Sequence, residues 1–357
     1  MNTGHARRSG ALVARTLAEA WRQSPPAPRF SADDPAEVAP LLLRSGAAAL
    51  AWRRSASPTF ENSPQISELR EAYRLHSIEA AVHEHHVKDV FQRMRAAGAE
   101  PLLLKGWAIA RLYTETGLRP YGDIDLWFAT EQRAVAETAL RSRHGYVYCV
   151  DLHTSFYSQF ERTIEDVFAH SQLVPLEDVS VRTACAEDHL RFLCLHFLFH
   201  GGWRPLWLCD IALAVESRGP DFDWDRCLTG KRRHADWIAS AIGLAHELLG
   251  ADVSGTPFER RAQNLPRWLT PAVLEQWGMG TGMSNAETLS FSVPRAILFP
   301  GRLVNALREH WRNPLQATVE VGASFGELPR APVQLAAAVR LVPKLARELG
   351  QRGRRQG

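Results

Sequence analysis

Long apolar runs, closely spaced cysteines and lysines are all scarce in this chain of 357 residues. No uninterrupted apolar run reaches the roughly 18 residues that a transmembrane helix needs. The 5 cysteines are scattered without C-x-x-C spacing, as expected for small core residues in a reducing compartment. An apolar patch near the N-terminus is broken by Arg15, too early for the apolar region of a signal peptide. We therefore expect a cytoplasmic protein that has no membrane partner.

A strong excess of one charge is also missing. The formal net charge of +3 is small for this length, so it gives no reason to expect nucleic acid as a partner. Nearly all basic residues are arginines, and the lysines are Lys88, Lys105, Lys231 and Lys344. Lys105 therefore stands out, because the chain uses arginine wherever any cation would serve. We interpret the basic stretch 347–355 as a solubilising end, with contact to acidic lipid or nucleic acid as the alternative.

The stretch PLLLKGWAIARLYTETGLRPYGDID, residues 101–125, organises the rest of the chain. Its apolar run 102–104 has the length and content of a buried strand. Lys105 and Gly106 follow at once, and the next apolar residues recur at helical spacing, so Gly106 is predicted at a strand-to-helix turn. A glycine there allows a phosphate to approach the backbone, and the start of a helix offers free N–H groups.

Asp123 and Asp125 belong to a second predicted strand, residues 123–128. Because side chains alternate along a strand, the two aspartates project to one face and the apolar residues to the other. Close carboxylates repel each other, and divalent cations between them relieve the repulsion. Aspartate is disfavoured in strands, so this pair favours a functional role over an acidic turn. The pattern therefore predicts a metal site on this strand.

Three segments carry a resemblance to a known family: LLLKG, LYTETGLRPYGDIDLWF, and the VDLH of residues 150–153. Together they resemble an uncharacterised nucleotidyltransferase family of the polymerase-beta-like superfamily. The resemblance covers roughly residues 66–252 and implies an α+β fold. With the helical patterns on either side, we expect a small mixed-sheet nucleotidyltransferase core at residues 99–185, a helical N-terminal extension at 1–98 and an α-helical domain at 186–357.

The resemblance implies an enzyme that transfers phosphorus-containing groups. It would be Mg²⁺-dependent and would move a nucleoside monophosphate from an NTP to a hydroxyl-bearing small molecule or peptide. Asp123 and Asp125 would hold two Mg²⁺ ions that stabilise the attacking and leaving oxygens. Asp151 would complete the metal site and help to deprotonate the acceptor hydroxyl. The acceptor, the preferred base and the oligomeric state do not follow from the sequence.

Three further residues are expected to bind the nucleotide's phosphates. Lys105 and the N–H group of Gly106 would neutralise the leaving pyrophosphate, and Arg119 could bind phosphate through two parallel hydrogen bonds. A module that binds a nucleotide without turnover, or a kinase on the same core, would use the same side chains. Released pyrophosphate indicates nucleotidyl transfer, ADP indicates a kinase, and neither product indicates binding alone.

The identity of the third carboxylate is left open by the residues. In most members of the family an insertion precedes the corresponding strand, whereas Gly145 here leads almost directly into Asp151. Glu161, Glu165 and Asp166 are the alternatives, although their helix-like spacing favours solvated residues. Whichever carboxylates share the site, their crowding predicts a raised pKa for at least one of Asp123, Asp125 and Asp151 in the absence of metal.

Other patterns predict structure more than chemistry. His196 and His200 share a face of an apolar helix, where packing is favoured over metal or substrate contact. The run His83-Glu84-His85-His86 lacks the spacing of a zinc-protease helix. The aspartates at 221, 223 and 225 are interpreted as a helix N-cap. The remaining predicted elements are helices at 66–97, 131–143, 187–200, 235–250, 293–312 and 335–349, and a strand at 146–152.

Overall fold

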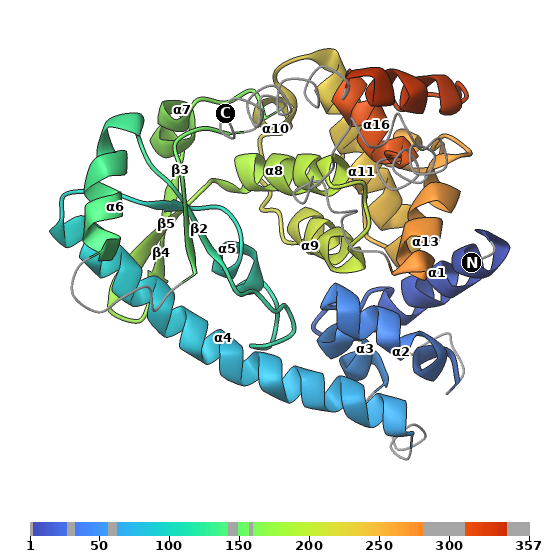
Figure 1. Cartoon of the computed structure of the whole chain (residues 1–357), viewed down its shortest axis with the longest axis horizontal. Helices are drawn as coiled ribbons and strands as arrows, with labels where there is room; N and C mark the ends of the chain where they lie inside the picture. Colours follow the sequence, from blue (N-terminus) through green and yellow to red (C-terminus); the bar gives the residue numbers. More distant parts are fainter. Residues whose placement is uncertain are drawn as a thin grey trace, which may run out of the picture.

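The computed structural model describes residues 3–26, 33–55, 63–141, 149–156, 160–280 and 311–340. A sheet lies at one end of the molecule, a group of helices fills the other end, and one long helix runs beneath both (Figure 1). This mixed architecture confirms the predicted fold class. In the described part of the chain, no helix is both long enough and apolar enough to cross a membrane.

The sheet has five strands in the order β3-β2-β1-β5-β4. Two neighbouring pairs are parallel, β2 with β3 and β1 with β5, and the other two pairs are antiparallel. The strands are β1 (Leu102–Leu103), β2 (Ile124–Trp127), β3 (Val150–His153), β4 (Gln172–Leu176) and β5 (Val179–Thr183). The first two match the predicted strands 102–104 and 123–128. The third starts later than the predicted 146–152, whose first residues lie outside the described part.

The hairpin β4–β5 was not predicted from the sequence. Its second strand nevertheless alternates in burial, with Val179, Val181 and Thr183 buried and the residues between them more exposed. Glu177 and Asp178 make the tight turn, and Glu177 has a positive φ of 52°. The pairing of β5 with β1 places this hairpin beside the strand that leads into Lys105.

Helices cover both faces of the sheet. On one face, α4 (Pro64–Ala96) contributes Val87, Val90 and Phe91 to a core shared with the inward side chains of β1, β2 and β5. The helix α6 (Arg133–Arg141) adds Ala136 to the same core. On the other face, Phe192 of α8 (Ala186–Phe199) makes an edge contact with the ring of Trp127 in β2. Both faces of β2 are therefore buried, as its burial pattern shows.

The N-terminal helices pack against helices that come much later in the chain. They are α1 (Thr3–Leu17), α2 (Asp33–Ser45) and α3 (Ala48–Ser55), and α1 lies against α13 (Leu269–Met279). A Cβ on Gly10 would lie 1.9 Å from the carbonyl oxygen of Leu274, and one on Gly278 only 1.7 Å from that of Ala6. The two glycines therefore allow the backbones of α1 and α13 to touch.

The remaining elements agree with several smaller expectations. Asp223 caps a helix by accepting a hydrogen bond from the backbone N–H of Arg226, and Gly250 closes another in the left-handed conformation. The helices of the described chain that have not yet been named are η1 (Thr130–Gln132), α5 (Trp107–Ala110), α7 (Ile164–Ala169), α9 (Pro205–Glu216), α10 (Trp224–Leu228), α11 (Arg232–Leu249), α12 (Glu259–Ala262), α16 (Pro314–Val321) and a helix at 331–340. The predicted helix 293–312, apart from its last residues, and the end of helix 335–349 lie outside the described residues. The predicted domain boundaries at 98/99 and 185/186 stay predictions.

Candidate active site

Three carboxylates meet at the β2–β3 edge of the sheet. The parallel register of β2 and β3 pairs Asp125 with Asp151, so the two side chains project side by side. Asp123 precedes Asp125 by two residues and shares its face, as alternation predicts. One oxygen from each of the three lies within 4.8 Å of the others. Asp125 is only 3% exposed, whereas Asp123 and Asp151 are exposed.

These three residues suit a divalent cation. They offer only carboxylate oxygens, the hard ligands that Mg²⁺ and Mn²⁺ prefer. A buried carboxylate with exposed ones beside it leaves the site open to a polyphosphate from solvent. The structure therefore brings together the metal ligands predicted from the sequence, with Asp151 as the third carboxylate.

Two cationic or protonatable side chains contact the buried member of the set. Lys105 Nζ lies 2.8 Å from Asp125 Oδ2, and His153 Nε2 lies 3.0 Å from Asp125 Oδ1. Burial alone would raise the pKa of Asp125, but the hydrogen bond from His153 and the charge of Lys105 outweigh burial and lower it. The raised pKa that crowding predicted for at least one of the three carboxylates therefore does not occur at Asp125, because these two partners oppose it.

His153 is a site residue that was not singled out from the sequence. It lies on β3 two residues after Asp151, so both side chains occur on the same face of the strand. Its ring stacks on the indole of Trp127 with centroids 4.6 Å apart. The signal was present in the sequence, since a histidine two residues after Asp151 lies on the strand face that carries the carboxylates of the neighbouring strand.

Gly106 occupies the turn between β1 and α5, as predicted. Its φ of +57° is a conformation that residues with a Cβ rarely adopt. A Cβ there would lie 3.3 Å from the carbonyl oxygen of Asp123 and 3.4 Å from the ring of Tyr121. The helix after it is one turn long, Trp107–Ala110, so the expected contribution of a helix dipole is small. The lack of a Cβ at Gly106 therefore allows its backbone to lie close to Asp123 and Tyr121.

Arg119 lies near the site but is already paired. Its Nη2 is 3.0 Å from Asp210 Oδ2 of α9, its Nε also faces that carboxylate, and Tyr113 donates to Asp210 Oδ1 at 2.8 Å. Arg119 is 7% exposed and Asp210 is 0% exposed. The two donors that could bind phosphate in parallel are thus used by Asp210. Arg119 joins the loop before β2 to α9, and its Nη1 donates a hydrogen bond to the carbonyl oxygen of Pro120.

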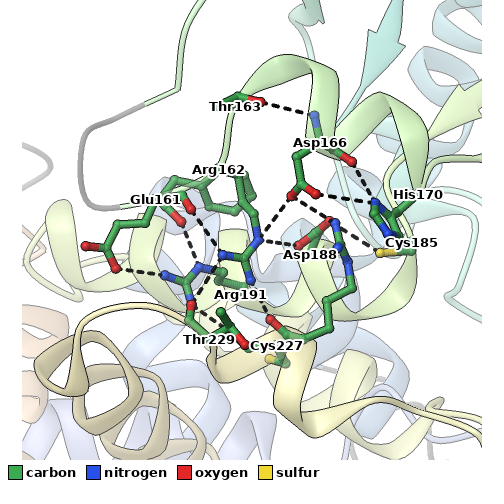
Figure 2. A network of polar contacts seen from close by, with 12 residues as sticks. Glu161, Arg162, Thr163, Asp166, His170, Cys185, Asp188, Arg191, Cys227 and Thr229 are labelled. Carbon is green, nitrogen blue, oxygen red and sulfur yellow. Dashed lines mark hydrogen bonds and ion pairs between the residues drawn. The ribbon is translucent and has the colours of Figure 1, made fainter.

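Two of the alternative third carboxylates, Glu161 and Asp166, belong to a separate polar network, which Figure 2 shows. Glu161 contacts Arg191 and His234, and Asp166 contacts Arg162 and Arg226. Glu165 is exposed in the first turn of α7. None of the three belongs to the carboxylate group at the β2–β3 edge.

His196 and His200 on α8 lie on the helical side of the site. Their ring centroids are 4.3 Å apart, and the ring of Trp207 lies 4.6 Å from His196. Burial lowers the pKa of His200 to about 4 and that of His196 well below its usual value, and the charge of Lys105 adds to both shifts. Both imidazoles are therefore neutral near pH 7, and both are close enough to Lys105 to feel its charge.

A mixed sheet that carries three converging carboxylates, beside a Lys-Gly turn, could hold a metal ion, as the predicted nucleotidyltransferase core requires. A model of an uncharacterised nucleotidyltransferase family matches residues 31–250. The chain belongs to this family, which confirms the resemblance drawn from the sequence. The match begins about 35 residues before the expected start and so includes α2 and α3. No curated protein and no solved structure matches the chain.

Proposed function

We propose that this protein is a Mg²⁺-dependent nucleotidyltransferase that moves a nucleoside monophosphate from an NTP to a hydroxyl group of a small molecule or peptide. The observation that carries the proposal is the paired register of Asp125 and Asp151, which fixes two carboxylates side by side with Asp123 beside them. The family to which the chain belongs supports a transferase of this type.

In the proposed reaction the acceptor oxygen forms a bond to the α-phosphorus of the NTP. The bond from that phosphorus to the bridging oxygen breaks, and pyrophosphate leaves with the bonding electrons. Mg²⁺ held by Asp123, Asp125 and Asp151 would stabilise the charge on the attacking and leaving oxygens. Asp151 is exposed, so it can take the proton of the acceptor hydroxyl. His153 holds the carboxylate of Asp125 in place through its hydrogen bond.

Lys105 and Gly106 are the proposed phosphate-binding residues of the core. The Lys105 side chain is about a quarter exposed and reaches the carboxylate of Asp125, so its ammonium group already lies at the predicted metal site. Gly106 has no Cβ, which allows its positive φ and would leave room for a phosphate to approach the backbone. Arg119 would contribute its positive charge while it stays bound to Asp210.

The proposal is tested by product analysis with the full chain, Mg²⁺ and each NTP, over a panel of hydroxyl-bearing small molecules and peptides. Pyrophosphate release coupled to a nucleotidylated acceptor is the expected result. ADP together with a phosphorylated acceptor would show a kinase instead. Lys105→Ala should weaken NTP binding and leave the metal ligands in place, so some activity should return at high NTP concentration.

A further inference from the structure

We propose that Arg204, which lies on the helical side of the site, binds the phosphate groups of the nucleotide opposite Lys105. This inference rests on the proposed nucleotidyltransferase function and names the residue that supplies a second cation. Arg119 was the expected second cation, but its parallel donors are held by Asp210. The position of Arg204, its lack of a carboxylate partner and its surroundings carry the assignment.

Arg204 is held in place from three sides. Its Nε donates a 2.8 Å hydrogen bond to the carbonyl oxygen of Ser45 at the end of α2. Its guanidinium carbon lies 5.6 Å from the ring centroid of Trp207 on α9. A Cβ on Gly46, whose φ is +74°, would lie 2.6 Å from Arg204 Nη2 and 3.4 Å from Pro120 Cγ. The guanidinium is therefore fixed where the α2–α3 turn meets the loop that carries Asp123.

The charge of Arg204 is not neutralised by a carboxylate. Burial lowers the pKa of Arg204 to about 10, and the charge of Arg119 adds to this effect. Asp210 and Asp123 act on it in the opposite direction, so both lie near enough for their charges to matter. Among the described residues none accepts a hydrogen bond from Nη1 or Nη2 and none forms an ion pair with Arg204. A half-buried cation without a partner is costly, and an anionic ligand would offset that cost.

Other shielded arginines in the molecule have carboxylate partners, in contrast to Arg204. Arg119, Arg162 and Arg226 each contact a buried aspartate. Arg204 is also largely shielded and has no such contact, yet the charge of Asp123, one of the three carboxylates expected to bind cations, acts on it. An NTP with Mg²⁺ would satisfy both groups together, because its phosphates need cationic partners beyond the metal.

A row of flat rings connects the metal site to Arg204. The row contains His153, Trp127, Phe192, His196, His200 and Trp207, and the centroids of successive rings are 4.6, 5.8, 5.7, 4.3 and 5.3 Å apart. Lys105 lies 6.0 Å from the Trp127 ring near one end of this row, and Arg204 lies over Trp207 at the other end. The row thus carries a cation at each end, with neutral imidazoles between them.

One buried polar atom in the row also lacks a partner. His196 is 9% exposed, and its Nδ1 is not hydrogen-bonded to any residue that the structure describes. A protein normally satisfies such an atom, so its presence beside Lys105 favours a ligand or water at this position. The family match extends to α2 and α3, which hold the Ser45 carbonyl and Gly46 against Arg204.

The test measures binding of inorganic tripolyphosphate and of each NTP by calorimetry, with Mg²⁺ and the full chain. Arg204→Gln should weaken both by about 10- to 100-fold, since hydrogen bonds to charged groups contribute this much. Arg204→Lys should recover part of the loss. Arg330→Gln is the matched control, because Arg330 is 8% exposed, has its pKa lowered by burial and lies 4.8 Å from the Trp268 ring. It should bind both probes as the wild type does.

The outcomes separate this inference from the proposed function. If the wild type and Arg204→Gln bind NTP equally well, the inference is overturned and the proposed function still stands. The same conclusion follows if Arg204→Gln raises only the KM for the acceptor. A wild type that binds neither probe would contradict both. If Arg204→Gln does not fold, phenylglyoxal labelling of the wild type replaces it. Tripolyphosphate should slow labelling at Arg204 and not at Arg218, and unchanged labelling at Arg204 would overturn the assignment.

Discussion

Two groups of charged side chains lie within this molecule, and their compositions differ in one respect. In the network of Figure 2, each carboxylate has a basic partner: Asp166 and Asp188 contact Arg162 and Arg226, and Glu161 contacts Arg191. At the β2–β3 edge, Asp125 has Lys105 and His153, but Asp123 and Asp151 add two further acidic groups. The first group is balanced, and the second has an excess of negative charge.

The difference shows that a high density of charge does not by itself mark a functional site. The balanced network joins α7, α8 and α10, so its role is to hold these helices together. The acidic excess at the β2–β3 edge is an arrangement that folding alone does not favour, because like charges repel. We therefore expect substitutions to affect stability in the network and catalysis at the sheet edge.

The largest effect on stability is expected from Asp188→Asn. Asp188 is 0% exposed, and removing its charge leaves Arg162 and Arg226 with only the partly exposed Asp166 as a carboxylate partner. Breaking a buried pair in this way costs about 3–5 kcal/mol of unfolding free energy. Urea denaturation measures the loss, and exposed Glu165→Gln on the nearby α7 should change the same quantity by less than about 0.5 kcal/mol. Activity per folded molecule should not change in either variant, and an Asp188→Asn protein as stable as the wild type would break the comparison.

Asp125→Asn should have the opposite effect: it should reduce activity and leave the fold intact. Turnover should fall by at least about 100-fold, since metal ions supply several kcal/mol of transition-state stabilisation. The fold should survive, because the amide oxygen can still accept a hydrogen bond from His153 or Lys105. Steady-state pyrophosphate release and a melting curve on the same sample measure both quantities. Full activity against an identified acceptor would show that Asp125 does not hold the catalytic metal.

A smaller effect on activity is expected from His153→Ala. Loss of the hydrogen bond to Asp125 should reduce kcat by about 10- to 100-fold, as for other residues that orient metal ligands. It should also raise the pKa of Asp125, because that bond is a main cause of the lowered value. An NMR titration of the Asp125 carboxyl separates this role from a purely structural one. His153→Gln, which can still donate, should restore part of the activity; an unchanged Asp125 titration in the Ala variant would rule out the positioning role.

The smallest effect concerns the pH dependence of stability in the network. Burial would raise the pKa of Glu161, but hydrogen bonds from Lys231 and His234 outweigh it and lower the pKa to about 2. The unfolded chain titrates this group near pH 4.3, so the stabilisation is complete above about pH 4.3 and is lost as pH falls towards 2. Melting temperatures of the wild type should therefore fall more steeply in this range than those of Glu161→Gln. Parallel curves would show that Glu161 contributes nothing to the pH dependence.

The features of the site that depend on neighbouring residues in the chain could be predicted from the sequence. Alternation along β2 placed Asp123 and Asp125 on one face, and the Lys105-Gly106 pair marked the strand-to-helix turn. Interactions between distant segments could not be predicted in the same way. No local pattern indicates that Arg119 meets Asp210, about 90 residues later, or that Ser45 holds Arg204. The lowered pKa of Asp125 likewise depends on tertiary contacts.

The hairpin β4–β5 illustrates another limit. Its strands have five residues each, and its turn residues Glu177 and Asp178 lack the glycine that usually marks a tight hairpin. Pairing with β1 stabilises these residues in a sheet, and such a pairing is not visible in a short window of sequence. The residues that make up the hydrophobic core on this side of the sheet likewise depend on the packing of α4 and α6 against the strands, which a short window of sequence does not reveal.

The central claim is that Asp123, Asp125 and Asp151 hold divalent cations and that the balanced network does not. Anomalous diffraction from crystals of the full chain grown with Mn²⁺ and an NTP tests this most directly. The account predicts at least one manganese peak within coordination distance of the carboxylates of Asp125 and Asp123, with Asp151 beside it, and none near Asp188 or Glu161. Saturating Mn²⁺ with no peak at the β2–β3 edge, or a peak bound within the network instead, would contradict it.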